Sequence, residues 1–344
     1  MKTLLITGGA GFIGSNFAHY MYAKYPDYRI IVLDCLTYAG SVENLPVRIW
    51  EDHDQRLSFW YGDIANAELV GSLVAESEFI VHFAAESHVT RSIYDNTQFF
   101  KTDVLGTQTV ANAVAKNSRK VERFIHISTS EVYGTSLSDK MDEGHPLNPM
   151  SPYASAKAGA DRLVYSYHTS YGIPAVIVRP FNNFGPRQHL EKVVPRFVTS
   201  VLLGEALTLH GHGEAKRDFV FVRDNCRALD MILHAPAEKV VGEVFNVGTG
   251  MARSIQEIAL DVARMMGNTG AKQEYIGDRP GQVDRHCADL SKIKTILGWQ
   301  PQISWEDGLA ETIRWYRENE AWWRKQLWLR KIPILTASGK REMH

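Results

Sequence analysis

Residues 4–14 read LLITGGAGFIG, and this segment is the strongest indication of the fold class. Its apolar start predicts a buried strand, and a helix is predicted from Phe12 to Lys24. Gly8, Gly11 and Gly14 lie at the junction between the two. Glycines there allow the tight turn, let the backbone approach a pyrophosphate and let the helix pack closely, while the helix N-terminus offers its amides to the phosphates. The stretch therefore predicts a dinucleotide-binding unit at the beginning of the chain.

The acid at the end of the next predicted strand indicates which dinucleotide binds. That strand covers residues 30–34, and Asp34 lies 20 positions after Gly14. A carboxylate at this place accepts a hydrogen bond from the ribose 2′-hydroxyl of NAD and repels the 2′-phosphate of NADP, so NAD is the expected cofactor. Asp63, after the following strand, is placed to meet the adenine, although a turn-forming aspartate is an equally good interpretation of it.

Strand and helix signals alternate through the first half of the chain. Short apolar runs separated by helical segments indicate βαβ units, so the expected fold class is α/β, with a Rossmann-like doubly wound parallel sheet. The further strands expected in this half are residues 57–61, 79–83, 124–128 and 175–179, and the helices are 67–76, 97–116 and 153–171.

After Pro180 the elements become shorter, and proline and glycine become frequent, which predicts a smaller C-terminal α/β lobe. The expected division is 1–180 for an NAD-binding domain, 181–330 for a substrate-binding lobe and 331–344 for a tail, with segments that can interleave. Residues 325–344 are basic and are expected to form a surface helix and a frayed tail. The elements expected within the lobe are strands 219–222 and 244–247 and helices 254–266 and 305–318.

The composition argues against several classes of protein. The chain has 344 residues, of which 38 are basic and 39 acidic, and the formal charge of −1 argues against a nucleic-acid carrier. Cys35, Cys226 and Cys287 are scattered, so neither a disulfide framework nor a metal site is predicted. No apolar run approaches the roughly 18 residues of a membrane span, and because the first residues already predict a strand, no signal peptide is expected. A cytoplasmic protein without metal or membrane partner is expected.

A tyrosine and a lysine share one face of a predicted helix. Tyr153 and Lys157 stand four positions apart. The lysine ammonium is expected to lower the pKa of the phenol from about 10, which makes the phenolate a usable base at neutral pH. A polar triplet, Thr129-Ser130-Glu131, follows a predicted strand, and open α/β sheets bind ligands at the carboxyl ends of their strands. Together these residues predict an acid–base site beside the nicotinamide.

These motifs resemble the extended short-chain dehydrogenase/reductases, and within them the NDP-sugar 4,6-dehydratases of the dTDP-glucose 4,6-dehydratase type. The resemblance extends over nearly the whole chain, and the combination of motifs is far more specific than any one alone. The motifs are 36–40 (LTYAG), 84–89 (AAESHV), 130–134 (SEVYG), 151–154 (SPYA), 182–186 (NNFGP), 279–281 (RPG) and 322–323 (WW).

The resemblance implies a role for each residue of the acid–base site. Thr129 would bind the sugar 4-hydroxyl, and Tyr153 would take its proton while NAD takes the C4 hydride. Lys157 would tune Tyr153. Glu131 would then remove the C5 proton, water would leave from C6, and the same NADH would return its hydride to C6. The product would be a 4-keto-6-deoxy sugar nucleotide.

Motifs and resemblance together give the expected contacts of both ligands. The expected catalytic residues are Thr129, Ser130, Glu131, Tyr153 and Lys157. Those expected to bind NAD are Gly8, Gly11, Phe12, Ile13, Gly14, Asp34, Asp63, Ile64, Ala84, Ala85, Tyr153 and Lys157. Those expected to bind the nucleotide-diphosphate sugar are Glu86, Ser87, His88, Asn182, Arg217 and Arg279. The resemblance also implies a homodimer, paired through the helices near 97–116 and 153–171.

One position departs from the dTDP-glucose enzymes, which carry Thr-Asp-Glu where this chain has Ser130 in the middle. A serine cannot supply a proton to the leaving 6-hydroxyl as readily as a carboxylic acid can. GDP-mannose 4,6-dehydratases and UDP-glucuronate decarboxylases share the serine, so a decarboxylase stays open as an alternative. Such decarboxylases offer an extra arginine for the sugar carboxylate where this chain has His286, which favours dehydration.

Two other functions stay open. An NDP-sugar 4-epimerase on the same scaffold needs no proton removal from C5, so Glu131 argues against it. An NAD-binding regulator without catalysis would need only the glycine loop, and the intact Thr129, Tyr153 and Lys157 argue against that function.

Overall fold

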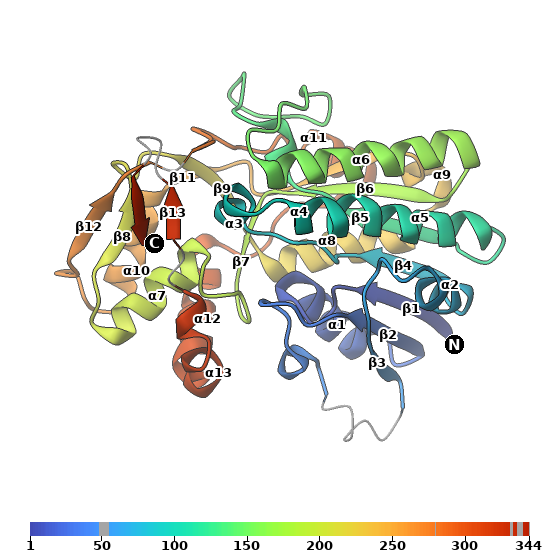
Figure 1. The fold of residues 1–344 in the computed structure, drawn as a ribbon, viewed down its shortest axis with the longest axis horizontal. Helices are drawn as coiled ribbons and strands as arrows, with labels where there is room; N and C mark the ends of the chain where they lie inside the picture. The colour runs from blue at the N-terminus through green and yellow to red at the C-terminus, as the bar shows by residue number, and fades with distance from the viewer. Residues whose placement is uncertain (48–54, 279, 331–332, 336–339, 344) are drawn as a thin grey trace.

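A seven-stranded parallel sheet runs through the larger part of the molecule (Figure 1). The structure, a computed structural model, describes residues 1–47, 55–278, 280–330, 333–335 and 340–343. The strand order is β10-β6-β5-β4-β1-β2-β3, so the order reverses between β1 and β4, where open α/β sheets bind their ligands. The strands are β1 (Lys2–Thr7), β2 (Tyr28–Asp34), β3 (Leu57–Tyr61), β4 (Phe79–His82), β5 (Arg123–Ile127), β6 (Ala175–Pro180) and β10 (Val244–Val247).

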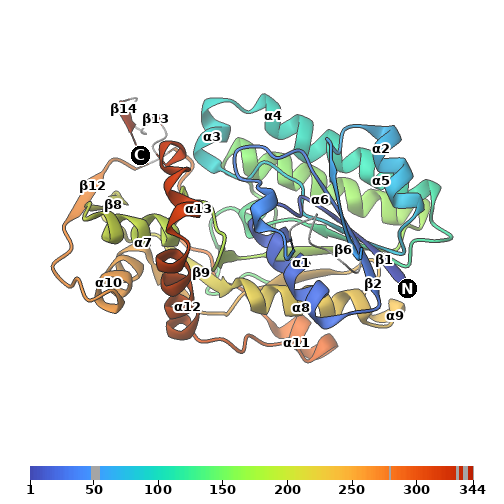
Figure 2. The same ribbon diagram turned by 90° about the horizontal axis from the view of Figure 1, so that it is seen from below.

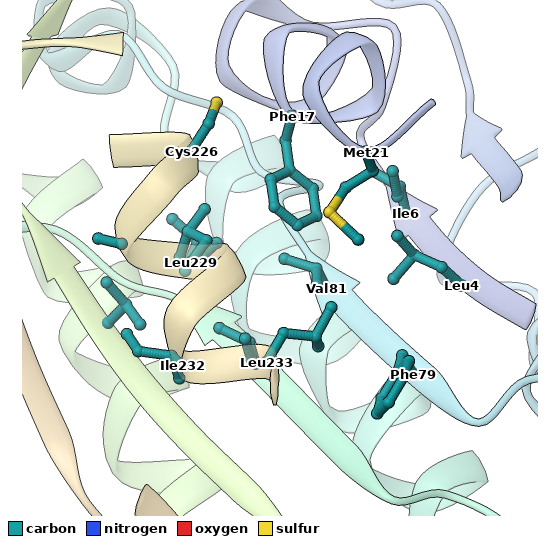
Figure 3. Close-up of a cluster of buried hydrophobic side chains, with 14 of the residues drawn as sticks. Leu4, Ile6, Phe17, Met21, Phe79, Val81, Cys226, Leu229, Ile232 and Leu233 are labelled. Atoms are coloured by element: carbon teal, nitrogen blue, oxygen red, sulfur yellow. The ribbon is translucent and has the colours of Figure 1, made fainter. Parts of the chain in front are cut away.

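Helices cover both faces of this sheet (Figure 2). Side chains alternate along a strand, so Leu4 and Ile6 of β1 belong to one core and Leu5 to the other. Figure 3 shows the first core, in which α1 and α8 bring apolar side chains together over β1 and β4. The helices on that face are α1 (Phe12–Lys24), α8 (Val222–His234) and α11 (Ser291–Leu297), and those on the other face are α2 (Ala67–Ala75), α5 (Thr107–Lys116) and α6 (Pro152–Tyr171).

The smaller part of the molecule has its own core, which contains Phe197, Leu309 and Trp323. Its strands form one sheet of order β11-β9-β7 and one pair, β12-β8. The strands are β7 (Asn182–Phe184), β8 (Leu207–His210), β9 (Lys216–Phe221), β11 (Ala252–Ser254) and β12 (Gln273–Ile276). The helices are α7 (Val193–Leu203), α10 (Ile255–Met265), α12 (Trp305–Glu318) and α13 (Glu320–Arg324).

The chain crosses between the two parts more than once. Helix α8 follows β9 of the smaller part, yet its apolar face belongs to the core of the large sheet. After α9 (Ala237–Val240), β10 pairs with β6 and becomes an edge strand of the large sheet. The expected division of the chain at residue 180, with segments that can interleave, stays a prediction.

The helix expected over 97–116 is divided into three pieces in the structure. It consists of α4 (Thr97–Phe99), a π-helical segment η3 (Phe100–Gly106) and α5. Gly106 lets η3 come close to Ile64, because a Cβ at Gly106 would stand 2.4 Å from the Cδ1 atom of Ile64. π-Helical turns are rare and are frequently found at functional sites.

The surface helix expected within residues 325–344 is wrong for the described residues. They form a short turn, η5 (Leu327–Leu329), and an antiparallel pair of β13 (Pro333–Leu335) with β14 (Arg341–Met343). Pro333 lacks the backbone N–H that a continuing helix would need. The strand expected over 219–222 also ends one residue earlier, because Val222 already begins α8. No helix of the described chain is long and apolar enough to cross a lipid bilayer.

Candidate active site

A cavity of about 430 Å³ lies where the carboxyl ends of the large sheet face the smaller part of the molecule. Residues that follow β1, β2, β4 and β5 line one side, and residues of β7, α7, β8 and β9 line the other. Ser130 is not among the described residues that line it, and the predicted Arg279 lies outside the described residues. The predicted residues in the lining are Gly8, Gly11, Phe12, Ile13, Gly14, Asp34, Asp63, Ile64, Ala84, Ala85, Glu86, Ser87, His88, Thr129, Glu131, Tyr153, Lys157, Asn182 and Arg217.

The turn after β1 is built so that a side chain has no place at two of its positions. Gly8 has a φ of +69°, and a Cβ there would stand 2.5 Å from the backbone nitrogen of Ala84. A Cβ on Gly14 would stand 2.3 Å from the carbonyl oxygen of Gly8. Gly11 is the N-cap of α1, and no described side chain caps its first amides. This cradle of backbone amides at the positive end of a helix fits the pyrophosphate of a dinucleotide.

Asp34 is held in place at the end of β2. Its Oδ2 atom accepts a hydrogen bond from the backbone of Ala10 at 3.0 Å, and its Oδ1 atom accepts one from Leu36 at 2.8 Å. Burial raises the pKa of Asp34, and these two hydrogen bonds oppose the rise. Asp63 also lines the cavity, and its Oδ1 atom accepts a hydrogen bond from Ala65, so both interpretations of Asp63 fit the structure.

The start of α6 brings the tyrosine and the lysine to the cavity wall. Ser151 is the N-cap and its hydroxyl accepts a hydrogen bond from the backbone of Ala154 at 3.1 Å, while Pro152 occupies the first turn. Tyr153 then lies in the first turn and Lys157 one turn later on the same side. Local sequence therefore determines where this pair lies.

The expected lowering of the pKa of Tyr153 by Lys157 is wrong for this structure. The Nζ atom of Lys157 donates a hydrogen bond to the carbonyl of Ile127 at 2.7 Å. Burial raises the pKa of Tyr153 above its ordinary value, the carboxylates of Asp103 and Glu131 raise it further, and a hydrogen bond with a threonine of the triplet opposes them. Burial also lowers the pKa of Lys157, against the effect of the Asp103 carboxylate.

Asp103, on the π-helical segment η3, is a carboxyl that sequence analysis missed. It is fully buried, and its Oδ1 atom accepts a hydrogen bond from the backbone of Glu86 at 2.8 Å. Its Oδ2 atom has no hydrogen-bond partner among the described residues. Burial raises the pKa of Asp103 to about 7, and Lys157 opposes this rise. No spacing rule identifies Asp103, because a π-helical turn changes the phase of the helix that precedes α5.

The polar triplet after β5 sends its side chains in two directions. Thr129 is the N-cap of the short helical turn η4 (Ser130–Tyr133), and its hydroxyl accepts a hydrogen bond from the backbone of Glu131 at 3.2 Å. Thr129 and Glu131 line the cavity, whereas Ser130 is 1% exposed and its Oγ atom lies 3.3 Å from Nδ1 of His286. Successive side chains of a 3-10 turn point about 120° apart, which explains why Ser130 turns away. Ser130 is therefore not part of the described cavity wall, and its expected catalytic role stays a prediction.

The predicted sugar-binding residues come from both parts of the molecule. Glu86, Ser87 and His88 follow β4, and the Nδ1 atom of His88 accepts a hydrogen bond from the backbone of the first turn of α3 (Val89–Tyr94). Asn182 lies on β7, and Arg217 lies on β9, where it is 4% exposed. The cavity therefore requires both parts of the chain to be folded together.

A buried cluster around Glu191 forms a further part of the cavity wall that sequence analysis missed. The carboxylate accepts hydrogen bonds from Tyr38 Oη at 2.9 Å and Arg91 Nε at 3.1 Å. A ring nitrogen of His88 lies 3.9 Å away and one of His189 lies 3.7 Å away. Burial alone would raise the pKa of Glu191, but the surrounding basic groups hold it at about 2. These residues come from segments far apart in sequence, so no local pattern predicts the cluster.

Several other polar residues of the lining were not among the predicted site residues. Lys192, next to Glu191, donates a hydrogen bond to the carbonyl of Ser87 at 2.7 Å and so joins the two sides of the cavity. The further polar lining residues are Thr37, Thr90, Thr102, Ser128, Asn183, Gln188, His189, Arg196, Thr208, His210 and Gln282.

The chain is similar to proteins of one enzyme family over almost its whole length. The family model described as GDP-mannose 4,6 dehydratase matches residues 5–312. The low-salt glycan biosynthesis protein Agl12 of Haloferax volcanii is 44% identical over 313 residues, which cover 91% of this chain and 98% of that protein. The structure of DesIV, a dTDP-glucose 4,6-dehydratase from Streptomyces venezuelae with NAD and TYD bound, has a TM-score of 0.88 at 43% identity and covers 94% of this chain and 99% of its own.

An epimerase structure is also similar, at lower identity. UDP-glucuronic acid 4-epimerase from Bacillus cereus, solved with UDP-glucuronic acid and NAD, has a TM-score of 0.85 at 29% identity and covers 92% of this chain and 99% of its own. The scaffold is therefore shared by proteins that bear the names of two different activities, and the residues of the cavity have to distinguish them.

Proposed function

The chain belongs to the GDP-mannose 4,6-dehydratase family and is an NAD-dependent NDP-sugar 4,6-dehydratase, and we propose that its substrate is dTDP-glucose. One observation carries the assignment of residues: a single cavity is lined by the glycine loop and by Thr129, Glu131 and Tyr153. The solved relative DesIV, at 43% identity, is a dTDP-glucose 4,6-dehydratase, which supports the choice of nucleotide and sugar.

The residues at the switch point of the sheet fit NAD. The backbone of Gly8 and Gly11 would hold its pyrophosphate at the start of α1, and Asp34 would hold the adenine ribose. NAD held there would supply a hydride acceptor for C4 of the hexose and, once reduced, a hydride donor for C6. Because both transfers occur within one turnover, the reaction consumes no net cofactor.

Tyr153 and Thr129 would carry out the proton transfer of the oxidation. Thr129 would accept the substrate 4-hydroxyl as a hydrogen-bond partner, and Tyr153 would take the proton of that hydroxyl. Lys157 donates a hydrogen bond to the carbonyl of Ile127, which fixes its ammonium group in the wall of the same cavity.

Glu131 would carry out the elimination. The ketone at C4 makes the C5 proton acidic, and Glu131 is the residue of the triplet whose carboxylate faces the cavity. A 4-epimerase needs no base for C5, so the place of Glu131 supports dehydration. A decarboxylase needs a cation for the sugar carboxylate, whereas His286 is buried away from the described cavity lining and burial lowers its pKa.

A panel of substrates tests the proposed function. The purified protein is incubated with dTDP-glucose, UDP-glucose, GDP-mannose and UDP-glucuronate, and the masses of the products are measured by mass spectrometry. Loss of water from dTDP-glucose, at a higher rate than from the other hexoses, is the expected result. Loss of carbon dioxide from UDP-glucuronate, or an unchanged mass with dTDP-glucose, would overturn the proposal.

We also propose that the protein is a homodimer that pairs through η3 and α6. These two segments pack on each other, and they expose large apolar side chains. The exposed fractions are 43% for Phe100, 55% for Leu105, 46% for Tyr165 and 64% for Tyr171. Leu105→Glu is expected to convert the dimer to a monomer in size-exclusion chromatography with light scattering, and an unchanged mass would contradict the choice of surface.

The cytoplasmic location stays a prediction.

A further inference from the structure

His286 connects the polar triplet to the smaller part of the molecule. It follows β12 in the sequence, is completely buried, and its backbone N–H donates a hydrogen bond to the carbonyl of Lys216 at 3.0 Å. Lys216 begins β9, the strand that carries Arg217. The ring of His286 reaches into the turn η4, which carries Glu131. A buried residue that is hydrogen-bonded to the strand β9 therefore contacts the turn that carries Glu131.

The tautomer of His286 follows from its partners. Its Nε2 atom lies 2.7 Å from the carbonyl oxygen of Gly134, which can only accept a hydrogen bond, so Nε2 carries the hydrogen. Burial lowers the pKa of His286, although Glu131 opposes this shift, so the ring is neutral near pH 7. The other ring nitrogen, Nδ1, therefore presents a lone pair.

The lone pair of Nδ1 faces two members of the triplet. The hydroxyl of Ser130 lies 3.3 Å away and can donate its hydrogen to the lone pair. The Oε1 atom of Glu131 lies 3.9 Å from the same nitrogen, which is close but beyond hydrogen-bond distance. Since the Ser130 hydrogen is directed at His286 and not at the cavity, Ser130 does not serve as the acid for the leaving oxygen.

We propose that His286 is the positioning residue of the elimination step, because it holds Ser130 and the turn η4 so that Glu131 can both take the C5 proton and deliver it to the leaving oxygen. This inference rests on the proposed dehydration. It assigns no direct contact with the sugar to His286, which acts through Glu131. It also explains how a chain with serine in the triplet eliminates water without a second carboxylic acid.

The proposed step balances within the substrate and Glu131. The C5–H bond breaks and its proton passes to the Glu131 carboxylate, while the electron pair forms the double bond between C5 and C6. The C6–O bond breaks, and the oxygen leaves with that proton as water. The hydrogen bond from Ser130 to Nδ1 of His286 keeps the turn η4, and with it the protonated Glu131, in place between these two transfers.

Two substitutions separate the two nitrogens of His286. In His286→Gln the side-chain amide can reach the carbonyl of Gly134 and replace Nε2, but the acceptor at Nδ1 is lost. In His286→Asn the shorter amide replaces Nδ1 and leaves Gly134 without its partner. The matched control is His145→Gln, because His145 is also buried, packs on Tyr133 of the same turn and lies outside the described lining of the cavity.

The experiment follows single turnovers by the absorbance of the reduced nicotinamide and by product mass, with a thermal melt of each variant. For His286→Gln we expect C4 oxidation at the normal rate and reduced nicotinamide that persists. Product formation should be at least tenfold slower, which is a part of the roughly 10²–10⁴-fold rate acceleration that a positioned acid–base group contributes. His286→Asn should be faster than His286→Gln, and the control should resemble the wild type. Full activity of His286→Gln, or rescue by Gln and not by Asn, would overturn the proposal. Absence of both reduced nicotinamide and water loss in the wild type would instead refute the proposed function.

Discussion

At the residue scale, Tyr153 stands in an environment that opposes its own ionisation. Burial and the carboxylates of Asp103 and Glu131 all raise the pKa of its phenol. The phenolate that we propose as the base for the sugar 4-hydroxyl is therefore destabilised by its surroundings. Its formation depends on the groups that approach the phenol oxygen, among them Thr129.

Removal of the Tyr153 hydroxyl is expected to stop the first step. Tyr153→Phe keeps the ring, which packs edge-on against Phe99, but it removes the proton acceptor. C4 oxidation should slow by about 10²–10⁴-fold, measured as reduced nicotinamide formed in a single turnover. Tyr165→Phe, on the exposed side of the same helix, is the control and should oxidise at the wild-type rate. Equal rates for the two variants would remove Tyr153 from the mechanism.

The substitution Glu131→Gln should separate oxidation from elimination. The amide keeps the size of the side chain but cannot take the C5 proton. C4 oxidation is expected to continue, and the reaction should then stop, with reduced nicotinamide visible and product formation lower by about 10²–10⁴-fold. Product mass and absorbance recorded on the same sample check both parts. Unimpaired loss of water from Glu131→Gln would show that another group is the base.

The sequence could predict the residues whose position depends on local rules. Asp34 ends a strand, and Tyr153 lies in the first turn of a helix that Ser151 caps, so strand ends and helix periodicity place both at the cavity. The direction of Ser130 depends on a 3-10 turn, and the surroundings of Glu191 depend on segments that meet only after folding. Neither leaves a signal in the spacing of residues.

At the scale of elements, the π-helical segment η3 gives Asp103 a direction different from the one that an α-helix would give it. An α-helix turns 100° per residue and a π-helical turn less, so the segment rotates Asp103 relative to the residues of α5. The Asp103 side chain meets the backbone of Glu86, which lies in the cavity wall. The bounds of α1 could be predicted to the residue, because glycines mark its start. Residues 97–116 were predicted as one long helix, and nothing in that pattern indicated the local change of helix type.

Asp103 should make stability depend on pH. Its pKa is raised by burial from an ordinary 3.8 to about 7, so between these values the folded protein binds a proton that the unfolded chain does not. Stability from this group is therefore greatest in acid and falls as pH rises to about 7. Relative to wild type, Asp103→Asn should gain on the order of 1–4 kcal/mol of unfolding free energy across that range.

Urea unfolding at a series of pH values measures this difference. The control is Asp139→Asn, because the side chain of Asp139 is 94% exposed, and its difference from wild type should stay flat with pH. A flat difference for Asp103→Asn as well would show that the buried carboxyl does not titrate in this range.

At the scale of the whole molecule, Glu191 joins the loop after β2, the helix α3 and the smaller part of the chain. Tyr38 and Arg91 reach it from the large sheet, and Glu191 itself precedes α7. Glu191→Gln leaves these donors and nearby cations without their buried carboxylate. We expect a loss of about 3–5 kcal/mol in unfolding free energy at neutral pH and a raised KM.

The pH dependence of that loss identifies its cause. The pKa of Glu191 is lowered from 4.5 to about 2, so its stabilising effect is present above 4.5 and disappears as pH falls towards 2. The variant and the wild type should therefore converge in acid, as measured by urea unfolding. Glu320→Gln, in an exposed pair with Arg324, is the control and should cost less than about 0.5 kcal/mol. A pH-independent loss would indicate a packing defect.

The order in which the large sheet is completed has a consequence for synthesis on the ribosome. Strand β6 receives its outer neighbour only from residues 244–247, after the polypeptide has passed through β7, α7, β8, β9 and α8. A nascent chain that pauses before residue 244 would present the backbone of β6 as an open edge, to which another growing chain could add a strand. Codon-level pausing within this interval would therefore promote aggregation more than pausing after β10 has been translated.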